Sequence, residues 1–401
     1  MPMELCRPAI ERVLVSLVRE RLTAIRGTVD DLPPVETWGT DTPLGTDGLA
    51  ADSMELLTLA GDVTRYFHLH EAGVEDYLLR YRRLGEWVEI IEAARDRGAT
   101  AITFATSGTT GEPRFCDHGW AGLAQEIDAL AGLFPDRRRV VGTVPAHHIY
   151  GFLFTVLLPT RLGIPVRDTL TEAVPGLSRS LTPGDLIVSH PLYWAYIART
   201  RPQFPEDVQG VTSTAPYPPE LAGDLKAAGL ERLVEIYGAT ETGGIGVRES
   251  PDAPFRLLDH WTRVGDRVAR TLPGGRRESP VSPPDHLVWE TDRCFRPAGR
   301  RDGAVQVGGI NVFPEAVARR IAEHPWVADC AVRPGGAAEG GRLKALIVLE
   351  GDMEPDGEVR RALRRWMEKQ LTTAERPVRI DFGPAVVRNE MGKSINWSAG
   401  D

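Results

Sequence analysis

The stretch TFATSGTTGEPR, at residues 103–114, is the part of the chain that most constrains its fold and its chemistry. An apolar run leads into glycine and hydroxyl residues, which predicts a strand that ends in a loop able to approach a polyphosphate closely. Hydroxyl groups donate hydrogen bonds to phosphate oxygens, and an arginine adds a charge-assisted contact. The predicted phosphate-binding residues are Thr106, Ser107, Gly108, Thr109, Thr110, Gly111 and Arg114.

Two other interpretations of this loop are a P-loop and a surface linker. A P-loop needs a second glycine and a lysine after four residues, whereas Pro113 and Arg114 occupy those positions after Gly108, so a Walker-type NTPase is not predicted. A surface linker rich in serine, threonine and glycine would have the same composition. The loop alone leaves that alternative open, and the other segments must decide.

Length and charge limit the class of protein. With 401 residues, of which 42% are hydrophobic, the chain is expected to form two or more domains. A net charge of -9 argues against a general nucleic-acid or anionic-membrane binder. No apolar run is long enough to span a bilayer, and charged residues interrupt the amino terminus, so we expect a cytoplasmic protein without a nucleic-acid or membrane partner. The scattered cysteines fit a reducing compartment and predict no metal site; they are Cys6, Cys116, Cys294 and Cys330.

The pattern of apolar and polar residues predicts an α/β fold in three parts. Residues 1–98 form a helical amino-terminal segment, with helical apolar spacing that includes an amphipathic stretch at 54–67. Residues 99–301 alternate short apolar runs with helical stretches, which is typical of a large α/β core with a largely parallel sheet. Within it, the proline-rich zone 249–284 is expected to be irregular or antiparallel β structure. Residues 302–401 are expected to form a small carboxyl-terminal α+β domain.

Three further segments carry candidate chemistry. In YGATETGG, at 237–244, Glu241 offers an oxygen ligand for Mg²⁺ and Thr240 a hydroxyl for a phosphate. Asp292 offers a carboxylate for ribose hydroxyls and is followed by GRRD at 299–302. Lys393 lies in MGK near the carboxyl terminus. Taken singly, each of these residues is also explained as a turn former or a surface charge.

In this order, the motifs resemble those of the adenylate-forming superfamily, which includes acyl- and aryl-CoA synthetases, peptide-synthetase adenylation domains and luciferases. The resemblance runs from about residue 101 to the end. AHHIYG at 146–151 is similar to the family's acid-pocket segment, STAP at 213–216 to its adenine-side loop, and GGINVFPE at 308–315 to the motif that opens its small domain.

The resemblance implies that ATP and Mg²⁺ are used to activate a carboxylic acid as an acyl adenylate. The acyl group then passes to a thiol of CoA or of phosphopantetheine on an acyl carrier protein. By the same resemblance, Lys393 bridges the carboxylate and phosphate, and the small domain swings about Asp302 so that this lysine leaves before the thiol arrives. Asp292 and Arg300 hold the ribose. The other residues implied are, for catalysis, Thr240, Glu241 (the metal ligand) and His148, and for nucleotide binding Ser213, Ala215, Pro216, Tyr237 and Gly238.

The sequence departs from the family in three places. Arg114 stands where the family usually has lysine, which keeps the charge but changes its shape. The phosphate loop begins near residue 104, so much of the family's usual amino-terminal portion is missing and the acid pocket is expected to be remodelled. The segment LAADSMELL at 49–57 resembles the phosphopantetheine attachment site of acyl carrier proteins, with Ser53 as the modified residue; alternatively, Asp52 or Ser53 caps a helix.

The nature of the acid is suggested by the residues near the expected pocket. Imidazole and aromatic side chains, among them Tyr193 and Trp194, favour an aryl acid over a long alkyl chain. The compact large domain fits, by analogy, a pathway-specific enzyme of secondary metabolism better than a general fatty acid activator. His147 and His148 are not predicted to bind a metal, because adjacent side chains point in different directions and no partner stands at ligand spacing. Two alternatives stay open: a non-catalytic nucleotide-binding or carrier-docking relative and, ranked last, an enzyme that stops at the adenylate or oxidises it.

Overall fold

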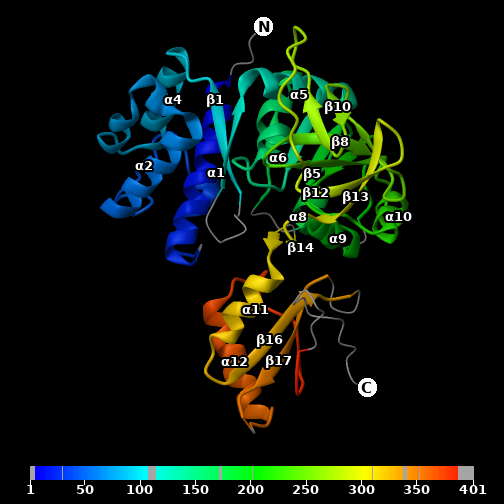
Figure 1. Cartoon of the computed structure of the whole chain (residues 1–401). Helices are drawn as coiled ribbons and strands as arrows, with labels where there is room; N and C mark the ends of the chain where they lie inside the picture. Colours follow the sequence, from blue (N-terminus) through cyan, green and yellow to red (C-terminus); the bar gives the residue numbers. More distant parts are fainter. Residues whose placement is uncertain are drawn as a thin grey trace. The chain divides into compact units, whose positions relative to one another are not determined.

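The structure, a computed structural model, is shown in Figure 1 and divides the chain into two compact units. Within the described residues, the larger unit takes in 5–106, 114–283 and 287–296, and the smaller one takes in 284–286 and 297–386. The structure describes residues 5–28, 30–106, 114–170, 174–200, 202–308, 310–336, 341–351 and 353–386.

The chain starts with helices, as predicted. Helix α1 (Arg7–Arg26) ends at Gly27, which adopts a left-handed φ of 72° that glycine tolerates. Helix α2 (Ser53–Phe67) is capped by Asp52, whose Oδ1 accepts hydrogen bonds of 2.8 Å from the backbone N–H groups of Met54 and Glu55. The Glu55 side chain in turn accepts the Asp52 N–H at 3.0 Å, which completes a capping box. The helix-cap interpretation of this segment is therefore confirmed.

These helices share a hydrophobic core with the rest of the larger unit. Helix α4 (Leu84–Asp96) contributes the buried Trp87, and the ring of Tyr66 on α2 lies 5.5 Å from Phe104 and 6.4 Å from Phe152 between centroids. Figure 1 shows α1 beside α2 and α4, and α2 also packs against β1. The amino-terminal helices are thus packed onto the α/β core.

A nine-stranded sheet forms the centre of the larger unit, in the order β12-β13-β9-β8-β7-β6-β5-β3-β4. Strands β4, β3, β5, β6 and β7 run parallel, and β8 and β9 continue the sheet antiparallel. The apolar runs predicted as strands therefore form adjacent parallel strands, as expected. The strands are β3 (Arg139–Gly142), β4 (Val166–Asp168), β5 (Asp185–Ser189), β6 (Gln209–Thr212), β7 (Arg232–Ala239), β8 (Gly243–Arg248), β9 (Phe255–Leu257), β12 (Asp285–Trp289) and β13 (Cys294–Arg300).

Two antiparallel hairpins accompany this sheet. Strands β1 (Ala101–Thr106) and β2 (Arg114–Gly119) pair from Ala101 opposite Gly119 to Thr106 opposite Arg114. Strands β10 (Trp261–Val264) and β11 (Arg267–Arg270) form the second hairpin, which confirms antiparallel structure in the proline-rich zone. The remaining helical elements of the unit are η1 (Val35–Thr37), α3 (Leu69–Ala72), η2 (Glu75–Leu79), α5 (Trp120–Leu133), α6 (Ile149–Gly151), η3 (Phe152–Leu157), α7 (Leu158–Leu162), α8 (Val174–Arg179), α9 (Pro191–Arg199) and α10 (Pro219–Ala227).

The smaller unit is an α+β domain with its own core. Its three-stranded sheet has the order β16-β17-β18, with β17 antiparallel to β16 and parallel to β18. Buried apolar side chains from the helices and the sheet, such as Ile321, Ile347 and Leu363, form that core. Within the described residues, no helix of either unit is long and apolar enough to cross a membrane. The unit's elements are β14 (Val305–Val307), β15 (Ile310–Val312), α11 (Pro314–Ala322), β16 (Val327–Pro334), β17 (Leu343–Leu349), α12 (Gly357–Gln370) and β18 (Arg379–Phe382).

Candidate active site

Three of the predicted site segments lie at one edge of the parallel sheet. The segments at 146–151, 213–216 and 240–243 follow β3, β6 and β7, and the carboxyl ends of parallel strands meet at the same edge. The hydroxyl of Tyr150 donates to the carbonyl oxygens of Ser189 at 2.9 Å and Val211 at 3.0 Å, which ties the first segment to the ends of β5 and β6. This edge is where a ligand is expected to bind in such a sheet.

The segment at 213–216, predicted to lie beside the adenine, is connected to the next strand. The Ser213 hydroxyl donates a hydrogen bond of 2.8 Å to the carbonyl oxygen of Ile236 on β7. Thr214 adopts a φ of 81°, an uncommon conformation for a β-branched residue, and Ala215 and Pro216 follow it with partly or largely exposed side chains. Non-glycine residues in such conformations cluster at ligand-binding sites, so this segment is a reasonable place for one.

The turn after β7 brings together the residues predicted to serve phosphate and metal. Thr240 is half-buried and Glu241 exposed, so both present oxygen atoms to solvent. Gly238 lies against the backbone of Gly243, where a Cβ would overlap the carbonyl group, so the close approach of β7 and β8 requires glycine. Tyr237 is buried, with its ring 5.5 Å from Phe255 and 5.2 Å from Phe295 between centroids.

The buried ion pair of Glu126 and Arg270 binds backbone atoms of this turn. The carboxylate of Glu126 on α5 accepts a hydrogen bond of 3.0 Å from Arg270 on β11 and another from the backbone N–H of Gly244 at 2.5 Å. Arg270 also donates to the carbonyl oxygen of Thr242 at 3.1 Å. Burial raises the pKa of Glu126, while Arg270 and the Gly244 N–H counteract that effect. Sequence patterns gave no signal for this pair, because its two members are 144 residues apart.

The β1–β2 hairpin reaches the same turn. His118 on β2 donates a hydrogen bond of 2.6 Å from Nε2 to the carbonyl oxygen of Thr240. Burial, followed by the negative charges of Glu241 and Asp117, raises the pKa of the Cys116 thiol to about 11. Thr106 ends β1 and Arg114 begins β2, so both ends of the predicted phosphate loop are at the hairpin; its residues Ser107, Gly108, Thr109, Thr110 and Gly111 lie outside the described residues.

The segment at 146–151, predicted to line the acid pocket, contacts helix α1, which the sequence did not predict. Nε2 of His147 lies 2.6 Å from Oε2 of Glu20, and Nε2 of His148 lies 3.3 Å from the same oxygen. The expectation that the two imidazoles point in different directions is therefore wrong, since both ring nitrogens converge on one carboxylate oxygen. His147 is buried, whereas His148, the predicted catalytic residue, keeps about half of its side chain exposed (48%).

The predicted ribose and hinge residues lie around β13. Asp292, in the turn before that strand, is almost fully exposed and lies 3.6 Å from Arg263. Arg300 donates to both carboxylate oxygens of Asp302, at 3.0 and 2.7 Å, and the Ala304 N–H adds a third hydrogen bond to Asp302. The structure thus brings Arg300 and Asp302 together, while Lys393 lies outside the described residues.

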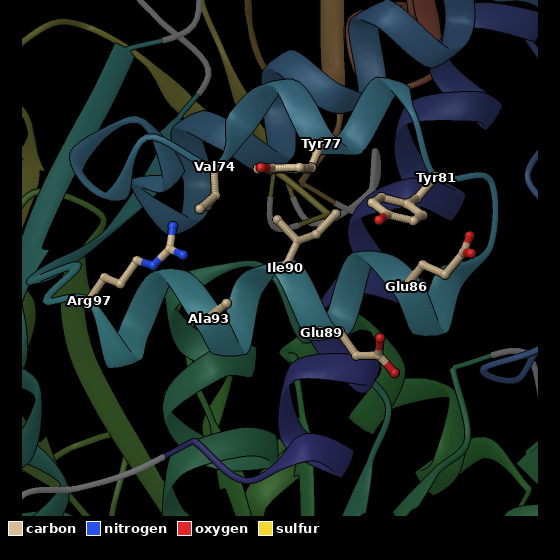
Figure 2. Close-up of a pocket in the computed structure, with 8 residues that line it drawn as sticks. All are labelled: Val74, Tyr77, Tyr81, Glu86, Glu89, Ile90, Ala93 and Arg97. Atoms are coloured by element: carbon tan, nitrogen blue, oxygen red, sulfur yellow. The ribbon is translucent and has the colours of Figure 1, made fainter.

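A separate hollow lies between η2 and α4 (Figure 2). Its walls are largely Val74, Ile90 and the rings of Tyr77 and Tyr81. Its two acidic residues are already engaged: Glu86 accepts the backbone N–H groups of residues 82 and 83, and Glu89 accepts a hydrogen bond from Arg7. The hollow therefore offers no acid-base pair for chemistry.

Two regions of the chain match models of known protein families. Residues 53–266 match the family described as AMP-binding enzyme, and residues 317–393 match the AMP-binding enzyme C-terminal domain. The chain belongs to the AMP-binding enzyme family. The first match includes the turn at Thr240 and Glu241, and the second ends at Lys393. This AMP-binding enzyme is therefore an adenylate-forming acid ligase, as the sequence resemblance implied.

The AMP-binding enzyme is similar to curated bacterial proteins over nearly its whole length. The 4-coumarate–CoA ligase of Halorhodospira halophila is 41% identical over 384 residues, which cover 95% of this chain and 97% of that protein. The 4-coumarate–CoA ligase of Rhodobacter capsulatus is 39% identical over 399 residues, covering 97% and 100%. The solved structure of o-succinylbenzoate CoA synthetase from Bacillus subtilis has a TM-score of 0.61 at 16% identity and covers 95% of this chain and 90% of that one. At that identity the likeness shows the adenylate-forming fold.

Proposed function

We propose that this AMP-binding enzyme uses ATP to activate an aryl carboxylic acid of the hydroxycinnamate type and transfers the acyl group to the thiol of CoA. The observation that carries the proposal is the near full-length similarity, at 39% and 41% identity, to relatives named 4-coumarate–CoA ligase. The exposed imidazole of His148 in the 146–151 segment supports an aryl substrate, because a flat ring packs well against another ring.

In the first step, a carboxylate oxygen of the acid forms a bond to the α-phosphorus of ATP, and the bond from that phosphorus to pyrophosphate breaks. Two anions must approach each other, so fixed positive charge lowers the barrier. We assign this charge to Lys393, which would contact the carboxylate and the α-phosphate. The hydroxyls of residues 106–110 and the Arg114 guanidinium would hold the other phosphates.

A magnesium ion fits the turn after β7. Glu241 offers an exposed carboxylate and Thr240 a partly exposed hydroxyl, and Mg²⁺ in nucleotide sites is usually held by one or two carboxylates together with substrate phosphates. When bound, the ion would offset negative charge on the phosphates. The Glu126–Arg270 pair and His118 hold the backbone of this turn, from which the Thr240 and Glu241 side chains extend.

The nucleoside would bind beside this turn, along the edge of the sheet. We assign the adenine to the segment with Ser213, Ala215 and Pro216 together with Tyr237 and Gly238. Asp292 and Arg300 would hold the ribose, and the exposed Asp292 carboxylate is accessible for that purpose.

In the second step, the thiol loses its proton, its sulfur forms a bond to the acyl carbon, and the bond from that carbon to the AMP oxygen breaks. We propose that the small domain, from residue 302 onward, rotates about Asp302 between the two steps, so that Lys393 withdraws before the thiol enters. Phosphopantetheine on an acyl carrier protein is the alternative acceptor.

Acid-dependent exchange of pyrophosphate into ATP tests the proposal. The panel includes 4-coumarate, cinnamate, hydroxybenzoates, 2-succinylbenzoate, amino acids and fatty acids of several lengths, followed by thioester formation with CoA or with a carrier protein. Strong exchange with hydroxycinnamates and a product with CoA are expected. Faster exchange with fatty acids would contradict the aryl assignment, and no exchange with any acid despite ATP binding would favour the non-catalytic alternative.

A further inference from the structure

Helix α1 touches the acid-pocket segment through two side chains one helical turn apart. Ser16 and Glu20 stand at i and i+4, so they lie on the same face of the helix. Both contact the segment that follows β3, more than 120 residues later in the chain, and neither belongs to the part that matches the family model for the large domain. We refer to Ser16 and Glu20 together as the α1 clamp.

The clamp satisfies the polar atoms of a buried imidazole. The Ser16 hydroxyl lies 2.8 Å from Nδ1 of His147 and accepts the backbone N–H of Ala146 at 3.0 Å. When this hydroxyl donates its proton to Nδ1, Nε2 carries the ring proton and donates it to Glu20 at 2.6 Å. His147 is only 7% exposed, so a ring nitrogen without these partners would be costly to bury.

The same carboxylate also reaches the exposed histidine. Oε2 of Glu20 lies 3.3 Å from Nε2 of His148, and the two imidazole rings are 4.3 Å apart between centroids. Burial would raise the pKa of Glu20, but hydrogen bonds from His147 and then His148 outweigh it and hold that pKa well below its usual value. Glu20 therefore stays ionised and orients both imidazoles.

The geometry is that of a hydrogen-bonded cluster. Ligand atoms around a tetrahedral Zn²⁺ are roughly 3.3 Å apart, given metal-to-nitrogen distances near 2.0 Å. The shortest separation here, 2.6 Å between Glu20 and His147, is that of a charge-assisted hydrogen bond. The arrangement thus suits a clamp that fixes protein groups to one another.

The segment is held at both of its ends. The α1 clamp fixes Ala146, His147 and His148, and the Tyr150 hydroxyl is fixed to the ends of β5 and β6. Gly151 packs against the carbonyl group of Pro145, which closes the segment on itself. Only the His148 side chain keeps a large exposed fraction, 48%, so it is the member of this segment that is free to contact a ligand.

We propose that Glu20 and Ser16 are positioning residues for the acid substrate: through His147 and His148, helix α1 sets the shape of the acid site and leaves the nucleotide site unaffected. The inference rests on the proposed function, because it takes the 146–151 segment as a wall of the acid site. The nucleotide turn has separate supports, Glu126, Arg270 and His118, and none of them contacts the α1 clamp in the described structure.

Steady-state pyrophosphate exchange with 4-coumarate separates these effects. We expect Glu20→Ala to raise KM for the acid about tenfold, since one charge-assisted hydrogen bond contributes about that factor, and to leave KM for ATP within about twofold. Glu20→Gln should show a smaller rise, because its amide oxygen still accepts one imidazole proton. Ser16→Ala should also raise KM for the acid.

Glu92→Ala is the matched control, because it also removes an ion pair of α1, the one between Glu92 on α4 and Arg7 at 3.1 Å, without touching the acid segment. An unchanged KM for the acid in Glu20→Ala would overturn the inference. Equal rises in both KM values, or the same change in Glu92→Ala, would show a general loss of structure and would also overturn it. If the unmodified enzyme gives no exchange with any acid, the proposed function is what fails, and the inference falls with it.

Discussion

The buried carboxylate of Glu126 holds the turn after β7, to which we assign phosphate and metal binding. It is fully buried with Arg270, whose guanidinium also binds the Thr242 carbonyl oxygen and lies 4.7 Å from the centre of the Trp261 ring. Removing one member of such a pair leaves the other charge buried without a partner. We expect Glu126→Gln to lower the free energy of unfolding by about 3–5 kcal/mol and to raise KM for ATP.

Urea unfolding of Glu126→Gln and Asp128→Asn, two positions on the same helix, checks this expectation. Asp128 pairs with Arg161, but both side chains are more than half exposed. Asp128→Asn removes this ion pair and should therefore lower the free energy of unfolding by less than about 1 kcal/mol. Equal effects of the two substitutions would contradict the role assigned to the buried pair.

His260 should make the protein sensitive to moderate acid. Burial, followed by the positive charge of Arg270, lowers the pKa of His260 from 6.5 to about 4, and its Nε2 is buried with no hydrogen-bond partner among the described residues. Between pH 6.5 and 4 the unfolded chain binds a proton that the folded one does not. The stability due to a neutral His260 is thus complete above pH 6.5 and falls by about 3 kcal/mol as the pH approaches 4.

The free energy of unfolding measured from pH 7 to pH 4 tests the role of His260. His260→Gln should reduce the loss of stability over this interval. His286→Gln, which replaces an exposed histidine, is the control and should leave the profile unchanged. A profile of His260→Gln identical to that of the unmodified protein would show that another group causes the acid sensitivity.

At the scale of elements, the start of α2 separates two interpretations of one motif. Asp52 is the residue that caps the helix, and Ser53 is its first helical residue. Asp52→Ala should therefore lower the free energy of unfolding by about 1 kcal/mol, while Ser53→Ala should change it by less than half of that amount. Thermal unfolding gives both values, and intact mass after coexpression with a phosphopantetheinyl transferase should show no gain. A mass gain that disappears in Ser53→Ala would establish a carrier function instead.

The elements differ in how far they were predictable. The helix at 54–67, the strands β3, β5 and β7 and the helices of the small domain follow from apolar periodicity and capping residues, which are local properties of the chain. The supports of the site are not local. Glu126 and Arg270 are 144 residues apart, and Ser16 and His147 are 131 residues apart, so no short pattern connects them. Family motifs identify groups that meet the ligand, whereas the groups that hold those motifs in place require the tertiary structure.

At the scale of the whole molecule, the division of the chain into two compact units suits a reaction that takes place in two chemical steps. Strand β13 carries the chain from the larger unit into the smaller one, and the Arg300–Asp302 pair lies directly after that crossing. A lysine on the smaller unit can serve one step and leave for the other only if that unit moves. The two steps should therefore respond differently to the loss of Lys393.

Lys393→Ala should reduce acid-dependent pyrophosphate exchange by about 10²–10³-fold if, as proposed, this lysine stabilises charge in the transition state of the first step. Transfer from a supplied coumaroyl adenylate to CoA should stay within about threefold, since the lysine has no part in that step. Lys369→Ala, at an exposed position near the end of α12 in the same unit, controls for a general effect of removing a lysine and should change neither rate. Loss of both steps to the same extent in Lys393→Ala would show that this residue acts in both halves of the reaction, and the proposed movement about Asp302 would then have no chemical purpose.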